Sequence, residues 1–247
     1  MFPSHDLRGA IKSIINQSHT NWELIIVDDA STDNSVKIIT EYLSDSRITL
    51  LKNKTNQGCY YSRNRGLFHV KDKEWSFFTI HDSDDESHHN RFLIYINTFY
   101  SELVECLLGI YNGKRWYNHN DKLILKYEAA KSSVGTAWYT KDTFNSLGYF
   151  YSSRFGSDSE YKEKLLRLAL VIEKYGNGVP PEQVIKFMNK EYAYTYTTKH
   201  SDISPSLTKK HSVEDRREFE KKYNDRHASF TNVKQFYQDF TPNKEDL

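Results

Sequence analysis

The stretch that decides the fold is WELIIVDDASTDNS, residues 22–35. Its first half is a short apolar run, which is typical of a strand buried on both faces of a parallel sheet. The run ends abruptly at Asp28 and Asp29. Ser31 and Asp33 follow, and either one can cap a helix whose apolar residues then recur at helical spacing. The stretch therefore predicts a strand, an acidic turn and a helix.

The same alternation continues along the chain in both directions. Short apolar or β-prone runs alternate with segments whose apolar residues recur every three or four positions. This order predicts an α/β fold with a mixed, mostly parallel sheet that is covered by helices on both faces. We expect helices at residues 7–15, 36–43, 60–68, 89–100 and 165–172, and strands at residues 22–27, 48–51, 75–80, 106–110 and 123–127.

Composition excludes several classes of protein. The 34 Lys and Arg residues balance 33 Asp and Glu residues, which argues against a dedicated nucleic-acid binder. No apolar run reaches the roughly 18–20 residues that a membrane span needs, and the first residues do not resemble a secretory signal. Cys59 and Cys106 are too few for a disulfide framework or a zinc cluster. We therefore expect a cytoplasmic location, either free or at the periphery of a membrane.

A second acidic cluster follows the predicted strand at residues 75–80. It contains Asp82, Asp84 and Asp85, whose charges repel one another unless a cation or basic groups offset them. Hard oxygen ligands at the end of a buried strand suit Mg²⁺ or Mn²⁺, and ligands of such sheets bind beyond the carboxyl ends of the strands. An exposed acidic loop is the alternative. The position directly after an apolar strand favours the metal site.

These pieces together resemble glycosyltransferase family 2, whose members have the GT-A fold. The resemblance is carried by residues 10–35, by Asn56-Gln57-Gly58, by residues 62–67 and by the acidic cluster at residues 82–85. It implies transfer of a sugar from a nucleotide diphosphate donor, usually with inversion at the anomeric carbon. Each motif is weak alone, but their order and spacing make the set specific.

The resemblance also assigns roles to residues of the first two clusters. Asp29 would contact the nucleotide base with Asp28 nearby, and Asp82 and Asp84 would hold the donor diphosphate through a metal ion. Asp84 is the better candidate for the direct ligand. Arg63 could meet a phosphate, although an ordinary salt bridge on its helix would explain it equally well.

Two further assignments come from the second half of the chain. Residues 156–161 occupy the place where the family has its catalytic base, and their spacing gives that role to Asp158. A carboxylate is suited to it because the attacking acceptor hydroxyl must lose its proton. A helix N-cap is the other interpretation of Asp158. His200 lies in a segment that resembles a loop closing over the donor, where it would be a third metal ligand or a surface residue.

The sequence departs from the family at its start. The family opens with a buried central strand before the helix that here begins near residue 6, and no such strand is present in this sequence. Its absence would leave one edge of the strand at residues 22–27 unpaired. A truncated start, another segment or partner chain that fills the gap, and a degenerate enzyme remain open. A second subunit in the gap would make a homo-oligomer obligatory.

The sequence thus predicts a catalytic domain over residues 1–205 and a charged, solvated helical tail over residues 206–247. The leading hypothesis is an inverting glycosyltransferase that uses Mn²⁺ or Mg²⁺. It would move a hexose from a UDP-sugar to a hydroxyl of a glycan, a lipid-linked acceptor or a protein. The alternative is an inactive GT-A-fold protein that binds a nucleotide-sugar or a glycan.

Overall fold

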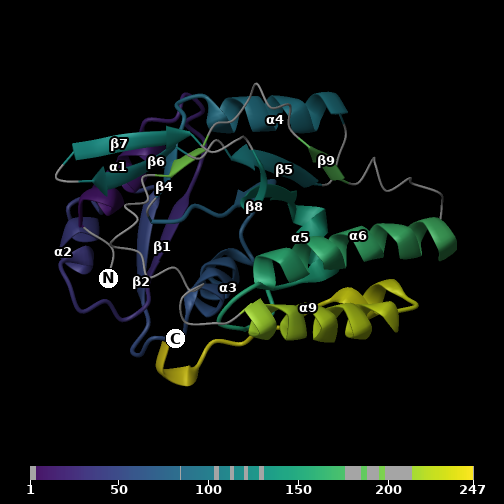
Figure 1. The fold of residues 1–247 in the computed structure, drawn as a ribbon. Coiled ribbons are helices and arrows are strands. Elements are labelled where there is room, and N and C mark those ends of the chain that lie inside the picture. Colours follow the sequence, from purple (N-terminus) through teal and green to yellow (C-terminus); the bar gives the residue numbers. More distant parts are fainter. Residues whose placement is uncertain are drawn as a thin grey trace.

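Helices surround a group of strands in the computed structural model of the chain (Figure 1). The structure describes residues 4–83, 85–102, 106–111, 114–119, 122–127, 131–175, 185–187, 195–197 and 213–246. The helices are α1 (Ser4–Ile15), α2 (Ser35–Thr40), α3 (Cys59–Val70), α4 (Arg91–Glu102), α5 (Lys141–Leu147), α6 (Ser157–Tyr175) and α9 (Val213–Ala228), with the 3-10 helices η2 (Val233–Phe236) and η3 (Lys244–Asp246). The strands are β1 (Leu24–Asp28), β2 (Ile48–Lys52), β3 (Phe77–Thr79), β4 (Asp85–Ser87), β5 (Cys106–Tyr111), β6 (Lys114–His119), β7 (Lys122–Tyr127), β8 (Lys131–Thr140), β9 (Ile185–Phe187) and β10 (Thr195–Thr197).

The first two strands form a parallel pair. Their register runs from Leu24 opposite Ile48 to Asp28 opposite Lys52, as the apolar runs predicted. Within the described part of the chain, the other edge of β1 has no strand partner. The four apolar residues of β1 are only half-buried, which fits a strand with one open edge. The strands that the structure describes therefore agree with the predicted unpaired edge.

The larger sheet has the order β3-β8-β5-β10-β4, with β9 also paired to β5. It is mixed: β9 and β10 run parallel to β5, whereas the β3/β8, β5/β8 and β4/β10 pairs are antiparallel. The α/β class is confirmed, but the expected predominance of parallel pairs needs correction. The chain passes from β5 to β8 through the antiparallel β6/β7 ribbon, without the helical crossover that a parallel pair requires.

Strand β8 separates the two main layers of side chains. Successive residues of a strand point to opposite faces of the sheet. Accordingly, Trp138 packs with Phe92, Tyr95 and Phe99 of α4, while its neighbours belong to the cluster that joins α3, α5 and α6. Helices therefore cover both faces, as predicted. A third cluster, between α1, α2 and the β1/β2 pair, contains Leu7, Ile11, Ile38, Ile39 and Ile48.

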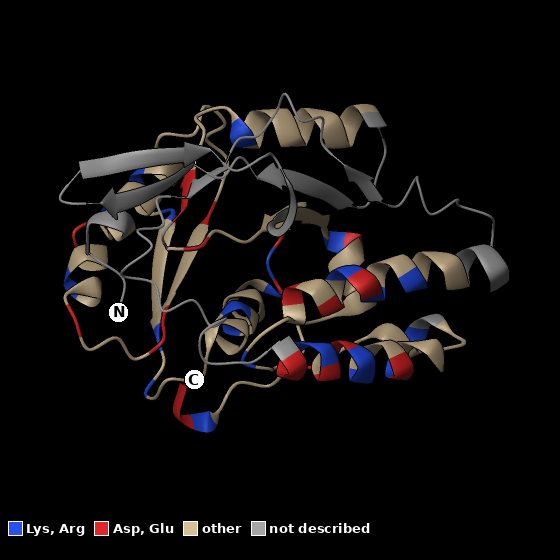
Figure 2. Cartoon of the chain, in the orientation of Figure 1, with Lys and Arg blue, Asp and Glu red and all other residues tan. Residues whose placement is uncertain are grey.

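The C-terminal segment, residues 213–246, packs against the rest of the chain. Its helix α9 carries exposed residues of both charge signs along its length (Figure 2). However, Tyr223 and His227 of this helix are buried, and Phe236 and Phe240 belong to the main core. The expectation of a solvated tail is therefore wrong for these residues. Their aromatic side chains stabilise the docked position by removing apolar surface from water.

Gly148 lies where the C-terminal segment meets the core. Gln238 donates its N–H to Leu147 O, and its carbonyl accepts from Tyr149 N, each at 2.8 Å. Gly148 itself has a φ of +67°. A Cβ at this position would clash with the backbone carbonyl of Gln238. The close approach of the two backbones therefore requires a residue without a side chain.

We expect Gly148→Ala to lower the free energy of unfolding by about 3 kcal/mol, because it combines a left-handed backbone with overpacking against Gln238. Urea unfolding followed by circular dichroism would measure the change. Gly66→Ala is the matched control: Gly66 lies inside α3, and a Cβ there would meet its nearest neighbours at 3.7 Å. This control should keep or gain stability. Equal stability of the Gly148→Ala variant and the wild type would contradict the tight approach.

Candidate functional site

Asp29 fastens the turn between β2 and α3. It follows the last residue of β1, and its Oδ1 accepts hydrogen bonds from Asn53 Nδ2 at 2.6 Å and from the Gln57 backbone at 2.9 Å. Its Oδ2 accepts from the Gly58 backbone at 2.7 Å. The carboxylate that was predicted to contact a nucleotide base therefore already organises the loop at residues 53–58.

Asp28 lies at the carboxyl end of β1 and is buried. Both of its carboxylate oxygens are 3.4 Å from the backbone nitrogen of Ser31, which is the long end of the hydrogen-bonding range. Its own carbonyl accepts from Asn53 N at 2.8 Å and so continues the β1/β2 pairing. Asp28 and Asp29 thus lie next to each other at the carboxyl end of β1, as predicted. The hydrogen bonds to the Asp28 carboxylate are longer than those to the Asp29 carboxylate.

Arg63 connects α3 to the acidic loop after β3. Its Nη2 donates to Asp82 Oδ1 at 2.7 Å, and its side chain is 14% exposed whereas that of Asp82 is 41% exposed. Burial alone would lower the pKa of Arg63, but the negative charges of Asp82 and Asp158 raise it above its ordinary value. The guanidinium therefore stays charged. The sequence allowed a salt bridge within the helix of Arg63. The observed salt bridge instead joins Arg63 to Asp82, in the loop after β3 that was predicted to hold the donor diphosphate.

Asp158 lies in the first turn of α6, one residue after the helix begins. Its Oδ1 accepts from the hydroxyl of Tyr60 at 2.8 Å and from Ser159 N at 2.9 Å. A negative charge in this turn is favoured by the helix dipole. The N-cap interpretation of Asp158 is wrong, because the residue lies inside the helix. The hydrogen bond with Tyr60 joins α6 to α3, although the two residues are 98 positions apart in the sequence.

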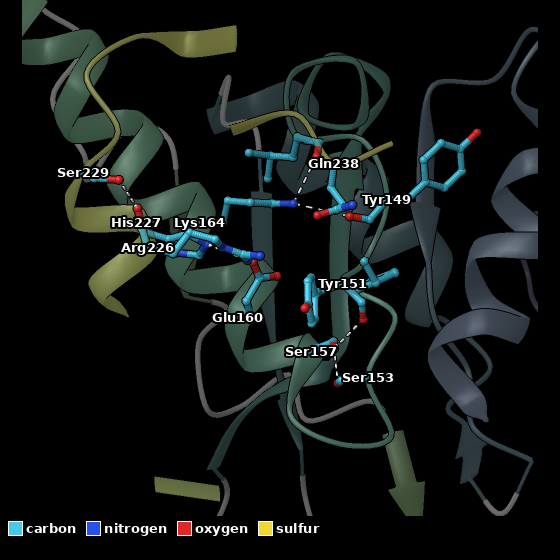
Figure 3. A network of polar contacts seen from close by, with 12 residues as sticks. Tyr149, Tyr151, Ser153, Ser157, Glu160, Lys164, Arg226, His227, Ser229 and Gln238 are labelled. Carbon is cyan, nitrogen blue, oxygen red and sulfur yellow. Dashed lines mark hydrogen bonds and ion pairs between the residues drawn. The ribbon is translucent and has the colours of Figure 1, made fainter. Parts of the chain in front are cut away.

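Ser157 supports the loop that leads into Asp158. It is fully buried, donates to Tyr151 O at 2.6 Å, and lies 2.6 Å from the hydroxyl of Ser153 (Figure 3). The resemblance implies a glutamate at this position. Here the smaller serine forms hydrogen bonds within the loop at residues 151–157. Asp158 is therefore the acidic side chain available next to this loop.

The buried residues behind the acidic loop fix its position. Arg91 is fully buried and donates to Ser87 Oγ and Thr79 Oγ1, each at 2.9 Å. Burial, with the nearby Arg91 charge, lowers the pKa of His81 to about 3, so this imidazole is neutral at ordinary pH. Asp85 is buried in β4, and its N–H donates to Asp82 O at 3.1 Å. This backbone contact ties the start of β4 to the acidic loop.

The side chains of Asp82, Arg63, Tyr60 and Asp158 form a continuous row. The Arg63 guanidinium lies 5.0 Å from the centre of the Tyr60 ring and so joins the ion pair on one side to the carboxylate on the other. Arg63 and Tyr60 thus connect Asp82 and Asp158, which lie far apart in the sequence. Asp84 and His200 lie outside the described residues.

Asp82 has the ligand chemistry that a divalent metal ion prefers. It offers hard carboxylate oxygens on a partly exposed loop, which suits Mg²⁺ or Mn²⁺. Among the described residues, no group of three or more His, Cys, Asp or Glu side chains could hold an ion. The donor type nevertheless fits, since Mg²⁺ is commonly held by one or two carboxylates together with water and substrate phosphates.

Sequence reasoning missed the residues that tie these elements together. Tyr60 and Asn53 carry no motif by which they could be recognised. Asp246 was part of the predicted tail, but it accepts from Lys54 N at 2.9 Å and from the Tyr61 hydroxyl at 2.8 Å. Arg65 donates both to the Asp246 carbonyl and, at 2.7 Å, to Asn53 Oδ1. The C-terminal segment thus supports the loop that Asp29 fastens.

Comparison with known proteins identifies the family. The model of glycosyl transferase family 2 matches residues 4–152, which is more than half of the chain. The chain therefore belongs to glycosyl transferase family 2. One relative is the UDP-Glc:alpha-D-GlcNAc-diphosphoundecaprenol beta-1,3-glucosyltransferase WfgD of Escherichia coli. The two sequences are 33% identical over 107 residues, and this alignment covers 43% of this chain and 41% of WfgD. This chain is 42% identical over 80 residues to a glycosyltransferase of Haemophilus influenzae, which covers 32% and 31% of the two chains.

Solved structures show the fold. A crystal structure of S. aureus TarS in complex with UDP-GlcNAc matches 89% of this chain and 62% of that chain, with a TM-score of 0.63 and 18% identity. The mannosyltransferase PcManGT from Pyrobaculum calidifontis, in complex with GDP-Man and Mn²⁺, matches 75% and 54%, with a TM-score of 0.50 and 16% identity. The fold is GT-A, as predicted. The chain spans less than half of each curated relative and less than two thirds of each solved chain.

Proposed function

We propose that the chain is an inverting, metal-dependent glycosyltransferase that moves a hexose from a UDP-sugar to an acceptor hydroxyl. The observation that carries the proposal is the row from Asp82 through Arg63 and Tyr60 to Asp158, in a chain of glycosyl transferase family 2. In this row a cation and a carboxylate flank the same tyrosine, which supports a role for the cation at the departing diphosphate and for the carboxylate at the attacking hydroxyl. The UDP-sugars in the names of WfgD and of the TarS complex support UDP as the nucleotide.

Asp158 is the proposed catalytic base. The acceptor oxygen forms a bond to the anomeric carbon while the bond from that carbon to the diphosphate oxygen breaks, and the hydroxyl proton passes to the carboxylate. An attack opposite to the leaving group inverts the configuration. The diphosphate leaves with the bonding electron pair, and the guanidinium of Arg63 is placed to stabilise the added negative charge.

Mn²⁺ or Mg²⁺ is the proposed cofactor, and Asp82, Asp84 and His200 are its proposed ligands. When bound, such an ion supplies further stabilisation of the leaving diphosphate. Asp28 and Asp29 are proposed to form the wall for the base and ribose at the end of β1, with Asp29 acting through the loop that it fastens. For the acceptor, we propose a lipid-linked glycan because the name of WfgD describes such a molecule.

None of the described helices has both the length and the apolar character of a membrane span. We propose that the protein acts at the surface of a membrane, because a lipid-linked acceptor is anchored there. Copurification with anionic vesicles would support this location.

Donor binding tests the proposed function directly. We expect calorimetry to show UDP binding that strengthens at least about tenfold when Mn²⁺ is added, a difference of about 1.4 kcal/mol. Asp84→Ala should remove the effect of Mn²⁺, and Ser83→Ala, at the neighbouring position, is the matched control. Turnover should follow in a hydrolysis screen of UDP-, GDP- and dTDP-sugars. A folded sample that binds no UDP would overturn the proposal.

Among the described residues β1 pairs with β2 alone, and this favours a second candidate function, a GT-A protein that binds a nucleotide-sugar without transferring it. A strand paired on one edge only, beside Asp28, would hold the donor site less rigidly than catalysis requires. This candidate predicts UDP binding with neither hydrolysis nor transfer for any donor. The hydrolysis screen therefore separates the two functions.

A further inference from the structure

Tyr60 has a polar contact that its packing does not require. It is the second residue of α3, is 5% exposed, and its ring lies 6.1 Å from the ring of Phe150, measured between centroids. The hydroxyl nevertheless reaches out of this apolar environment to Asp158 Oδ1 at 2.8 Å. A phenylalanine would fill the same space. The hydroxyl therefore serves the carboxylate and not the core.

The hydrogen bonds to Asp158 distinguish its two oxygens. In the part of the chain that the structure describes, Tyr60 and the Ser159 backbone both donate to Oδ1. Two donors on one oxygen fix the rotation of the carboxylate group and leave Oδ2 to receive a proton. Preorganisation of this kind is what a general base needs, because proton transfer depends on hydrogen-bond geometry before it depends on basicity.

Tyr60 remains a donor under ordinary conditions. Burial, together with the negative charge of Asp158, raises the pKa of the phenol well above its usual value. The Arg63 guanidinium lies over the same ring and pairs with Asp82. The phenol is thus held between the cation of the proposed diphosphate side and the carboxylate of the proposed acceptor side.

We propose that Tyr60 is a positioning residue, which holds Asp158 in the orientation that accepts the proton of the acceptor hydroxyl. This inference rests on the proposed function. Asp158 interacts electrostatically with Cys59, Tyr60 and Arg63 of α3 and with Tyr223 of α9. Of these, Tyr60 is the one that donates a hydrogen bond to the carboxylate.

The test is Tyr60→Phe, which keeps the ring and removes the hydroxyl. We expect kcat for donor turnover to fall about tenfold, the loss of one hydrogen bond to a charged group, while the KM for the donor stays unchanged. A purely structural role would leave the kcat of the folded variant unchanged.

Tyr61→Phe is the matched control. Tyr61 is the next residue of the same helix, and its hydroxyl also donates to a carboxylate at 2.8 Å, but that carboxylate belongs to Asp246. Its removal should leave kcat unchanged. Thermal unfolding of both variants would show that the assays are made on folded protein.

The outcomes separate this inference from the proposed function. Wild-type protein without turnover, or an Asp158→Asn variant with full turnover, would overturn the proposed base and the role of Tyr60 with it. An active wild type, an inactive Asp158→Asn variant and a Tyr60→Phe variant with the wild-type kcat would overturn the role of Tyr60 alone. A lower kcat with an unchanged donor KM in Tyr60→Phe, but not in Tyr61→Phe, supports it.

Discussion

Asp158→Asn should reduce sugar transfer by about 10²- to 10⁴-fold while the affinity for UDP stays unchanged. The amide has the same shape, and its oxygen can still accept from Tyr60, so the local structure should be preserved. What it lacks is the basic oxygen that takes the proton of the acceptor hydroxyl. Calorimetry with UDP and Mn²⁺, beside a turnover assay with the donor found in the hydrolysis screen, would measure the two quantities separately.

Asp142→Asn provides the control for this experiment. Asp142 also lies in the first turn of a helix, α5, but is exposed. Its variant should keep the wild-type rate. Turnover by Asp158→Asn at the same rate as this control would show that another group accepts the proton, and the assignment of the base would then be wrong.

Glu160→Ala should lower the free energy of unfolding by about 3 kcal/mol. The Glu160 side chain is 1% exposed, and its Oε1 lies 2.6 Å from Arg226 Nη2 and 2.9 Å from His227 Nε2, both on α9 (Figure 3). On its own helix, Lys164 is also buried and donates to two backbone carbonyls. Removal of the glutamate leaves the buried positive charge of Lys164 without its counterion.

Glu163→Ala is the matched control, since Glu163 pairs with Lys162 at the surface of the same helix. Exposed pairs contribute little, so this variant should lose at most about 1 kcal/mol. Chemical denaturation would compare the two. Similar losses for both variants would mean that the contacts between α6 and α9 contribute little to stability.

The buried Glu160 also makes the stability of the protein depend on pH. Burial alone would raise the pKa of Glu160, but His227, Lys164 and Arg226 together lower it below its ordinary value of 4.5. Because the folded value is the lower one, the ionised glutamate stabilises the native state at neutral pH, and this contribution disappears as the pH falls below the ordinary glutamate range. Glu160→Gln should therefore differ most from wild type near neutral pH, and the difference should shrink in acid.

The fold was largely predictable because it follows local patterns. The apolar run before Asp28 and Asp29 and the helical spacing around it gave β1 and its neighbours, and the ends of β1 and β3 are where the two acidic clusters lie. Docking of α9 was missed because charged residues dominate its sequence. Phe219, Tyr223 and His227 recur every four positions and form one face of that helix, a signal that could have revealed the buried side.

The supporting residues of the site were not predictable in the same way. The contact of Tyr60 with Asp158 joins positions 98 residues apart, and no spacing in the sequence specifies it. The engagement of Asp29 by the loop at residues 53–58 likewise depends on how β1 and β2 pair. Such contacts depend on the tertiary structure, which brings together residues from distant parts of the sequence. No local sequence motif marks these residues.

The contacts of Asp246 with Lys54 and Tyr61 span 192 and 185 residues. On the ribosome, the polypeptide that contains β1, β2 and α3 emerges long before Asp246 is synthesised. Contacts between such distant positions form late, since closing a long loop must precede them. The nascent chain consequently spends most of its translation with this region unsupported, so chaperones that bind emerging polypeptides should favour a high yield of native protein.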